Sequence, residues 1–480
     1  MKQELIVYWA RRDFRLHDNP ALTQAIEFSK RNDVPFLPMY IIDKGYIEDP
    51  KQNISYPRRY FLYNVVQSFA GEFEKFAIGI GSPETVFDEL SQKYSLKLYC
   101  NDDIEPFSRL RDKQIKDCVE NNGGEFFRVA EIMSVSLETR SQSNTIYTVF
   151  TPFKNAVWKE FIGNEPLDRV DLGGADYAAN DSISDLKHMF RYSKSSFRSE
   201  LSWLTSPDWK VYYPTSNNDS LDLLAIHNDT PDLSEWKTDE NSVLVDASNY
   251  IRHHIPDYNQ NRNDLGKDMT SKMSYALKWG IISARTLRQK VGQEYDIEAD
   301  SGAQSYISEL IWREFYKYVL YHYPHVLDTE YLEKRRNLDW IQGGEAKRRF
   351  ESWVSGTTGF EVVDSAMKQI AKTGWMHNRS RMITASVLTK NLGVDWRWGQ
   401  AYFRAALVDL DEASNNGGWQ WSASVGVDPK PIRIFNPFTQ KDKFDPVDTY
   451  SQKWLKSPVS QTIVDYKSSR HEALRRYGLE

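Results

Sequence analysis

The first 135 residues alternate between short apolar runs and segments whose apolar positions recur at helical spacing. Apolar runs predict buried strands at residues 5–9, 35–42, 96–100 and 126–130, and helical spacing predicts helices at 20–30, 60–76 and 107–120. This alternation predicts a parallel, Rossmann-like sheet covered by helices, an α/β fold that binds ligands at the carboxyl ends of its strands. Gly79 and Gly81 lack the third glycine of a dinucleotide fingerprint and lie at no clear strand–helix junction, which argues against an NAD site.

The pattern changes twice further along the chain. From about residue 160 the sequence is rich in Asp, Asn, Ser and Gly, which is typical of a long connector. Helical periodicity then dominates, for example at residues 270–280, 301–323, 359–372 and 377–392. We therefore expect an α/β domain at 1–135, a connector at 136–247, an all-helical domain at 248–465 and a short tail at 466–480.

Composition excludes several classes of protein. The hydrophobic fraction of 40% and the charged fraction of 27% are those of a globular chain and argue against disorder or simple repeats. Two cysteines cannot build a disulfide scaffold, an iron–sulfur cluster or a Cys-rich zinc site, and we expect no metal. The sequence shows neither a signal peptide nor a membrane span, so we expect a cytoplasmic protein with no membrane partner.

Charge argues against nucleic-acid binding at first, because phosphate affinity comes from Lys and Arg and the chain has a net charge of −6. The charge is uneven, however. The last 180 residues carry 25 basic and 21 acidic side chains, whereas the first 300 carry 36 and 46. The last 180 residues also hold nine of the 15 tryptophans, so the helical part is mildly basic and rich in indoles.

Three segments of the second half combine charged, amide and indole side chains. They contain Glu309, Trp312, Arg313 and Tyr316; then Asn378, Arg379, Arg381 and Met382; then Asp409, Asp411, Asn415, Trp419 and Trp421. Taken alone, the first segment is equally consistent with an amphipathic helix surface that carries an ion pair. The arginines of the second could extend along apolar surface to reach water, or could bind phosphate. The Asn-Asn-Gly-Gly run of the third would form an ordinary turn in most proteins.

Together these segments resemble the photolyase/cryptochrome family, most closely its class I cyclobutane pyrimidine dimer photolyases. The resemblance runs nearly end to end, with the family's motifs at residues 8–20, 375–384, 415–421 and 433–440. It implies an N-terminal α/β domain joined by a long linker to an all-helical domain that holds FAD bent into a U. Residue 273 is Met where leucine is more usual, a change between two apolar side chains.

The resemblance also implies which residues hold the flavin. We expect these to be Tyr258, Thr270, Ser271, Lys272, Met273, Ser274, Arg313, Asn378, Arg381, Asp409, Leu410, Asp411 and Asn415. An ion pair between Arg381 and Asp409 is expected beside the ring. Asn415 would face flavin N5 and help keep the fully reduced anion, whereas plant cryptochromes are similar but carry aspartate there.

For the reaction, the resemblance implies that light excites the reduced flavin anion, which passes an electron to a pyrimidine dimer; the cyclobutane ring opens and the electron returns. The lesion must first leave the base stack. The implied catalytic residues are Glu309, Trp312, Met382, Asn415 and Trp421. The implied DNA contacts are Arg262, Glu309, Trp312, Tyr316, Asn378, Arg379, Trp421, Arg433, Gln440 and Lys443. Lys443, between Asp442 and Asp445, is equally consistent with a solvated surface charge.

The expected partner is UV-damaged DNA, single- or double-stranded, bound by a monomer that would be nucleoid-associated in a prokaryote. Three tryptophans, Trp419, Trp396 and Trp340, match the family's electron-transfer chain. Asp103, Glu105 and Arg111 resemble the crevice of members that bind a deazaflavin antenna. Folate-binding members use an Asn-Glu pair where this chain has Phe107 and Ser108, so deazaflavin, methenyltetrahydrofolate or no antenna all stay open.

Three other functions compete with dimer repair. The Trp-Met-His-Asn-Arg run beginning at Trp375 differs from the paired histidines of six-four photolyases. A cryptochrome-type blue-light receptor would share the flavin, but Asn415, Glu309 and Trp312 favour repair. A flavin-free, aromatic-rich nucleic-acid-binding protein would require the FAD motifs to be accidental.

Overall fold

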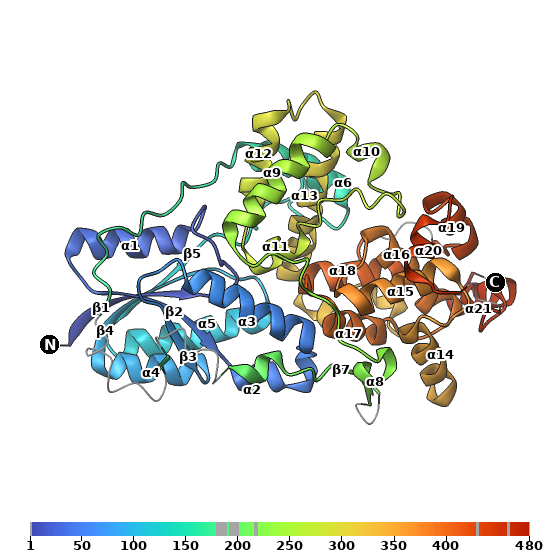
Figure 1. Cartoon of the computed structure of the whole chain (residues 1–480), viewed down its shortest axis with the longest axis horizontal. Coiled ribbons are helices and arrows are strands. Elements are labelled where there is room, and N and C mark those ends of the chain that lie inside the picture. The colour runs from blue at the N-terminus through green and yellow to red at the C-terminus, as the bar shows by residue number, and fades with distance from the viewer. Residues whose placement is uncertain are drawn as a thin grey trace.

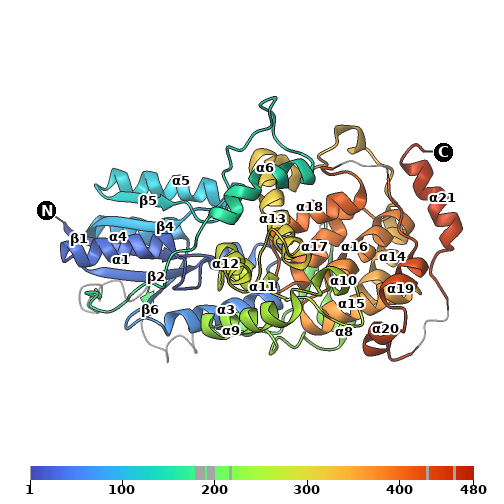
Figure 2. The ribbon, with the colours of Figure 1, turned by 90° about the horizontal axis from the view of Figure 1, so that it is seen from above.

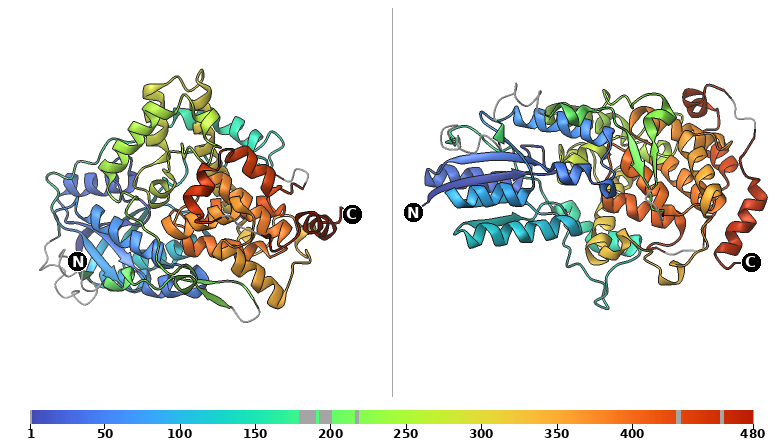
Figure 3. Two further views of the ribbon diagram at one scale, coloured as in Figure 1. Left: turned by 45° about the vertical axis from the view of Figure 1, so that its right-hand side comes forward. Right: turned by 90° about the horizontal axis from the view of Figure 1, so that it is seen from below.

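The computed structural model describes residues 2–178, 190–191, 201–215, 219–428, 432–457 and 461–479. A sheet with its helices lies on one side of the molecule and a large group of helices on the other (Figure 1). The N-terminus and the C-terminal helix lie at opposite ends of the long axis (Figure 2), and the turned views keep the same two groups apart (Figure 3). This arrangement confirms the predicted α/β part and helical part.

The sheet has the strand order β5-β4-β1-β2-β3-β6. Its strands are β1 (Gln3–Ala10), β2 (Phe36–Ile42), β3 (Ala77–Ile80), β4 (Tyr94–Asn101), β5 (Glu125–Val129) and β6 (Phe190–Arg191). Strands β1 to β5 pair in parallel, and β6 adds to β3 as an antiparallel edge. Strands β1, β2 and β4 are buried on both faces, which is why they appear in the sequence as continuous apolar runs rather than as an alternation.

Five helices belong to the α/β part: α1 (Pro20–Asn32), α2 (Lys44–Glu48), α3 (Tyr56–Ala70), α4 (Pro83–Lys93) and α5 (Pro106–Asn121); η1 (Pro50–Gln52) is a 3₁₀ turn. The predicted helix at 60–76 begins and ends earlier than expected, as α3. The expectation that Gly79 and Gly81 lie at no strand–helix junction is wrong. β3 ends at Ile80 and α4 follows at Pro83, but β3 has only four residues, too few for a clear apolar pattern.

The predicted connector contains regular structure. Its described elements are α6 (Phe150–Gly163), η3 (Ser202–Thr205), β7 (Lys210–Tyr212), β8 (Ser220–Asp222), α8 (Leu223–His227) and the start of α9. After α6 the chain returns along the α/β part, where it pairs through the bridges His17–Arg169 and Phe36–Tyr177 (Figure 1). The connector thus contributes to both parts, and the domain boundaries themselves stay a prediction.

The helical part confirms the predicted periodic segments. Its elements are α9 (Glu240–His254), α10 (Tyr258–Asn261), α11 (Ser274–Trp279), α12 (Ala284–Glu294), α13 (Ser301–His322), η4 (Pro324–Leu327), η5 (Glu333–Arg335), α14 (Gly343–Ser355), α15 (Glu361–Thr373), α16 (Asn378–Ser386), the π-helical turn η6 (Val387–Asn391), α17 (Trp396–Ala406), α18 (Glu412–Ala423), α19 (Pro437–Phe444), α20 (Thr449–Trp454) and α21 (Tyr466–Arg476). The predicted tail is therefore mostly helix α21. No helix in the described part of the chain is long and apolar enough to cross a membrane.

Buried polar contacts join the two parts. The Asp18 carboxylate pairs with Arg285 at 2.8 Å, and both side chains are almost fully buried. The Glu240 carboxylate, at the start of α9, accepts hydrogen bonds from the backbone N–H groups of Leu16 and His17 at 3.0 and 2.9 Å. Because buried charges need such partners, these contacts fix how the helical part is placed against the sheet.

The Asn-Asn-Gly-Gly run, which would form an ordinary turn in most proteins, lies inside helix α18 here. Gly417 explains why a helix carries glycine here. A Cβ at this position would lie 2.0 Å from the ring of Tyr316 on α13, so only glycine lets the two helices approach this closely. Gly418, the next residue, has nothing within 4 Å of a Cβ placed on it.

We predict opposite effects for two neighbouring substitutions. Gly417→Ala forces the Tyr316 ring away and lowers the free energy of unfolding by about 1–3 kcal/mol. Gly418→Ala is the matched control and raises it by about 0.5–1 kcal/mol, because alanine costs less backbone entropy than glycine inside a helix. Urea unfolding of the cofactor-free protein measures both, and equal effects would contradict the close helix approach.

Candidate active site

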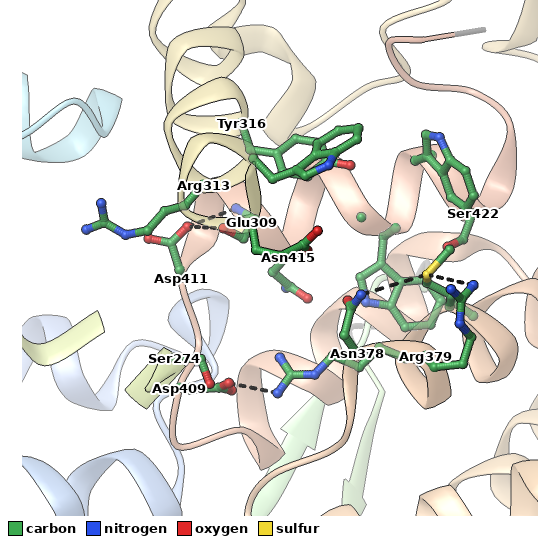
Figure 4. A pocket seen from close by; sticks show the side chains of 18 of the residues that line it. Ser274, Glu309, Arg313, Tyr316, Asn378, Arg379, Asp409, Asp411, Asn415 and Ser422 are labelled. Carbon is green, nitrogen blue, oxygen red and sulfur yellow. Dashed lines mark hydrogen bonds and ion pairs between the residues drawn. The ribbon is translucent and has the colours of Figure 1, made fainter. Parts of the chain in front are cut away.

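A single cavity of about 640 Å³ in the helical part brings together most of the predicted site residues. Its lining includes Tyr258, Arg262, Ser271, Met273, Ser274, Glu309, Trp312, Arg313, Tyr316, Asn378, Arg379, Arg381, Met382, Asp409, Leu410, Asp411, Asn415, Trp419, Trp421 and Arg433. Of the residues predicted to contact flavin, lesion or DNA, four are not among the lining residues: Thr270, Lys272, Gln440 and Lys443. Figure 4 shows Glu309, Arg313 and Tyr316 projecting from the same helix, α13.

An ion pair lies in the buried end of this cavity. Arg381 Nη2 lies 2.7 Å from Asp409 Oδ2, and its Nε donates to the backbone carbonyl of Met376 at 2.8 Å. The Asp409 side chain is 1% exposed. Its second oxygen, Oδ1, and Asn415 Oδ1 are both buried without a hydrogen-bond partner among the described residues. Because an unpaired buried acceptor is costly, these two oxygens are suited to donors of a bound group.

Asp411 is surrounded by cations from other elements. Burial alone would raise the pKa of its carboxyl, but Lys317, Arg313 and Lys278 together hold that pKa well below its usual range. Burial in turn lowers the pKa of Lys278 and of Lys317 to about 8. Sequence reasoning missed both lysines, although Lys278 follows Ser274 and Lys317 follows Arg313 by four positions, the spacing that places two side chains on one helical face.

Two serine hydroxyls are oriented by aromatic neighbours. Ser271 Oγ accepts a hydrogen bond from Tyr306 O–H, and Ser274 Oγ accepts one from the indole N–H of Trp375, each at 3.2 Å. Each serine therefore keeps its own hydrogen for an acceptor in the cavity, such as a phosphate oxygen.

Two neighbours of these serines are placed differently. The ammonium group of Lys272 pairs with Glu235 at 2.8 Å and with Asp268 at 2.9 Å, so its side chain is occupied outside the cavity. Thr270 Oγ1 is buried and has no hydrogen-bond partner within the described ranges, although Thr270 does not line the cavity.

The more exposed end of the cavity holds a second ion pair. Arg262 Nη2 lies 2.7 Å from Glu309 Oε1, and the two side chains are 25% and 30% exposed. Arg379 Nη2 donates to Asn263 Oδ1 at 2.6 Å, and its Nη1 lies 3.7 Å from the sulfur of Met382. Water reaches these groups, whereas Asp409 and Asn415 are buried. One end of the cavity is therefore buried and polar, and the other end is charged and exposed to solvent.

Aromatic rings form part of the wall. Trp312 on α13 stacks on Phe150 with ring centroids 3.6 Å apart and an interplanar angle of 8°. The ring centroids of Trp421, on α18, and Phe435 are 6.5 Å apart, and both residues line the cavity. Sequence reasoning missed Phe150, which lies in the predicted connector, where no motif marks it.

The three predicted electron-transfer tryptophans are all buried. Trp419 packs closely on Gly399 of α17, where a Cβ would lie 2.0 Å from the indole, and its own N–H has no partner among the described residues. Trp396 begins α17 and donates its N–H to Glu330 at 3.1 Å. Trp340 lies beneath Arg476, whose guanidinium carbon is 5.8 Å from the ring centroid.

Two of the predicted antenna residues converge on one arginine. Asp103 and Glu105 follow β4 and both pair with Arg12, which follows β1. β1 and β4 are neighbours in the sheet, and the chain adds β2 and β3 on one side of this pair and β5 on the other. These residues therefore lie at the topological switch point of the sheet. Arg111 instead pairs with Asp112 at 2.9 Å and stacks over Trp9, so it does not share the Arg12 cluster.

The predicted DNA contacts outside the cavity lie on α19. Lys443 is exposed, and Asp445 does not neutralise it, because Asp445 is buried and accepts hydrogen bonds from Tyr450 and Ser451. Arg433 is exposed at the cavity rim, and Gln440 is half-buried. No group of three or more His, Cys, Asp or Glu side chains that could hold a metal ion occurs in the described ranges.

Comparisons with known proteins place this site in a family. Residues 6–171 match the family model described as DNA photolyase, and residues 306–459 match the one described as FAD binding domain of DNA photolyase. A deoxyribodipyrimidine photo-lyase of Synechococcus sp. is 32% identical, covering 94% of this chain and 87% of that protein. The chain belongs to the DNA photolyase family. It therefore has the family's FAD-binding domain.

Solved structures of photolyases and cryptochromes share the fold. A bacterial class III photolyase from Agrobacterium tumefaciens aligns over 100% of this chain and 98% of its own, with a TM-score of 0.80 and 25% identity. A Synechocystis cryptochrome aligns over 100% of both chains, with a TM-score of 0.76 and 22% identity, which shows the fold alone. Because a class III photolyase aligns over the whole chain, membership of class I stays a prediction.

The residues of this photolyase cavity fit FAD. Its volume lies within the range of about 300–1,000 Å³ typical of cofactor sites. The unpaired oxygens of Asp409 and Asn415 suit the N–H groups of a flavin ring. The hydroxyls of Ser271 and Ser274 and the guanidinium of Arg313 suit phosphate oxygens.

His377 caps helix α16 next to the cavity. It is 2% exposed, and its Nδ1 accepts from the backbone N–H of Arg379 at 3.0 Å. Burial, followed by the charges of Arg379 and Arg381, lowers the pKa of His377 to about 4. The unfolded chain therefore takes up this proton first as the pH falls, so the folded state loses stability between about pH 6.5 and pH 4.

We predict that His377→Asn removes part of this pH dependence, because asparagine also caps a helix but does not titrate. Wild-type protein should lose up to about 1.4 kcal/mol of unfolding free energy more per pH unit than the variant over that range. Urea unfolding at several pH values measures the difference. Parallel curves for the two proteins would contradict a neutral, buried His377.

Proposed function

We propose that this chain is a photolyase that uses light to split cyclobutane pyrimidine dimers in UV-damaged DNA. The observation that carries the proposal is that one cavity holds both sets of residues that this reaction requires. Acceptors and cations suited to a flavin lie at its buried end, and a carboxylate, an amide and indoles lie at its open end. The relatives named deoxyribodipyrimidine photo-lyase support the same reaction.

In this proposal, bound FAD in its reduced anionic form supplies the light-absorbing electron donor that side chains cannot provide. The chain's own residues hold and tune it. Asn415 Oδ1, which is buried without a partner among the described residues, would accept from a ring N–H, and the pair of Arg381 and Asp409 would compensate charge near the ring. The other predicted contacts, including Tyr258, Met273, Asn378, Leu410 and Asp411, line the same cavity.

At the open end, we assign Glu309 to the carbonyl and N–H edge of the flipped-out pyrimidines. Its carboxylate is paired with Arg262 here, and a DNA phosphate would compete for the same guanidinium, which leaves Glu309 available to the lesion. Trp421, Met382 and the ring face of Trp312 opposite Phe150 would contact the lesion through apolar surface.

Phosphate contacts would come from exposed or half-buried groups around the opening, namely Arg262, Tyr316, Arg379, Arg433, Gln440 and Lys443. Such contacts position DNA without reading its sequence, as repair of a lesion in any sequence requires. We further propose that the protein acts as a monomer on single- or double-stranded DNA in the cytoplasm and, in a bacterium, at the nucleoid. The bacterial relatives support this location.

The second candidate function is a cryptochrome-type receptor, because a cryptochrome shares the fold. Repair is favoured by the amide of Asn415 and by Glu309 and Trp312 at the same opening. Within the family we propose class I membership. For an antenna we propose the switch-point site of Asp103 and Glu105, which could take a deazaflavin or methenyltetrahydrofolate.

The first test is light-dependent loss of thymine dimers from an irradiated oligonucleotide. We predict repair by the FAD-loaded, reduced wild-type protein and a quantum yield about tenfold lower for Glu309→Ala, since a hydrogen bond to a charged group is worth roughly that factor. Glu333→Gln, at a side chain that is 84% exposed, is the matched control and should repair normally. A flavin-containing protein that repairs no dimer would favour the receptor.

The second test concerns the tryptophans. We predict that Trp419→Phe suppresses photoreduction of oxidised FAD while repair by chemically reduced protein stays largely intact. Trp209→Phe also removes a fully buried indole, but one that does not line the cavity, and should photoreduce normally. Absorbance of the flavin under steady illumination measures both. Normal photoreduction in Trp419→Phe would contradict the assignment of Trp419 to the electron-transfer chain.

A further inference from the structure

Lys278, on helix α11, brings an ammonium group to the cavity without a direct partner. It lines the large cavity and also a small neighbouring cavity of about 10 Å³, whose walls come from both the helical part and the α/β part. Within the described ranges, Lys278 Nζ makes no hydrogen bond and no ion pair. The nearest aromatic ring is that of Trp279, with its centroid 6.0 Å away. The ammonium group is therefore available to a group bound in the cavity.

More positive than negative groups surround Lys278. The charged side chains that face it are Arg12, Arg58, Glu105, Asp411, Arg313 and Lys317. Both carboxylates of this set have other partners. Glu105 pairs with Arg12, and Asp411 Oδ1 accepts from the N–H and O–H of Ser414 at 2.9 and 2.8 Å. Because four of these six groups are cations, an anion beside Lys278 would balance an excess of positive charge.

The other cations at the buried end of the cavity already have carboxylate partners. Arg381 pairs with Asp409, and Arg313 pairs with Glu314 at 2.9 Å. No carboxylate pairs in this way with Lys278 in the part of the chain that the structure describes. Lys278 is thus the cation at this end whose charge is left for a ligand.

The position of Lys278 along α11 indicates which part of a ligand it would meet. It follows Ser274 by four residues, the spacing that places two side chains on one helical face. The hydroxyl of Ser274 is oriented by Trp375 so that its own hydrogen suits a phosphate oxygen. An ammonium group and a hydroxyl on one face of the cavity wall together suit a phosphate.

Lys272 is the obvious alternative, because it lies between the two serines of the motif. Its ammonium group pairs with Glu235 at 2.8 Å and with Asp268 at 2.9 Å, and Lys272 does not line the cavity. The charge of Lys272 is therefore compensated outside the cavity. Two lysines six residues apart differ in this respect, and only the second faces the site.

We propose that Lys278 binds the diphosphate of FAD and thereby makes this site select FAD over flavins that lack the diphosphate. The inference rests on FAD as the cofactor of this cavity and does not require the repair reaction. An ammonium group is a compact charge with three N–H donors, so it can contact several oxygens of the diphosphate. The hydroxyls of Ser271 and Ser274 add two neutral donors beside it.

The first test measures the dissociation constant of FAD. Full-length, FAD-loaded protein is diluted at pH 7, and the recovery of flavin fluorescence reports the released cofactor. Lys278→Met should weaken FAD binding by about tenfold to a hundredfold, the range that a hydrogen bond between charged groups provides. Lys272→Met is the matched control, since it removes a lysine whose charge is compensated outside the cavity, and should bind FAD as wild type does.

Riboflavin, which has the flavin ring but no phosphate, is the second probe. It should bind equally tightly to wild type and to Lys278→Met, because the contacts of Asp409 and Asn415 with the ring are unchanged. Lys278→Arg keeps a cation and should restore most of the affinity for FAD. Equal losses of FAD in Lys278→Met and Lys272→Met, or loss of riboflavin along with FAD, would overturn the proposal.

The pH dependence of FAD affinity is an independent readout. Without an anion, burial lowers the pKa of Lys278 to about 8, and a bound diphosphate raises it again. Binding therefore takes up a proton above about pH 8, so the affinity of wild type should fall as the pH rises, by up to about tenfold per pH unit. Lys278→Arg stays charged and should show a flatter profile.

Lys317 also has a pKa that burial lowers to about 8, but it donates to the backbone carbonyl of Ile132 and does not line the large cavity. It is present in wild type and in Lys278→Arg alike, so the difference between the two profiles isolates Lys278. Parallel profiles would contradict the proposal.

Failure of the proposed function is distinguishable, because FAD binding requires neither light nor DNA. A protein in which Lys278→Met loses FAD but wild type repairs no dimer would contradict the repair function alone. A protein that repairs dimers while Lys278→Met holds FAD as tightly as wild type would contradict the role of Lys278 alone.

Discussion

The close approach of helix α18 to its neighbours is the constraint on which the rest of this site depends. Gly417 lets α18 pack against Tyr316 of α13, and Gly399 lets Trp419 of α18 press against α17. At both positions a Cβ would lie 2.0 Å from a ring atom of the neighbour. Since interiors are closely packed, this contact sets the direction of every other side chain on α18, including Asn415 and Trp421.

The second constraint is electrostatic. A cavity with buried carboxylates is stable only if cations from the surrounding elements reach them. Asp409 meets Arg381 of α16, and Asp411 meets Lys317 of α13 and Lys278 of α11. These cations come from three helices spread over residues 278–381 of the chain, so the charge balance requires the helical part to be assembled. The ammonium groups of Lys278 and Lys317 are themselves removed from water, and this burial lowers the pKa of each to about 8.

Much of this architecture could be predicted from the sequence. Strands buried on both faces and long helices leave strong apolar patterns, so β1, β2, β4 and α13 were predicted close to their bounds. The residues of one cavity could be predicted because they lie in motifs that resemble a known family. β3, with four residues, is too short to leave such a pattern.

Other features could not be predicted because they depend on direction and on distant contacts. Spacing places Lys272 beside the serines of the cavity, but it does not show that Glu235 and Asp268 draw its ammonium group away. The Asn-Asn-Gly-Gly run favours a turn by local propensity, and only packing against Tyr316 explains a helix. Glu330 is an isolated carboxylate in the sequence, and its contact with Trp396 exists only in the folded chain.

The stacking of Phe150 on Trp312 has a consequence for how this protein can change in evolution. Phe150 begins α6, which belongs to the stretch between the sheet and the helical part, yet it covers one face of an indole in the cavity wall. A helical part inherited or exchanged without this stretch would expose that indole face. The two halves are therefore not interchangeable modules, and substitutions at the start of α6 and in the middle of α13 should be selected together.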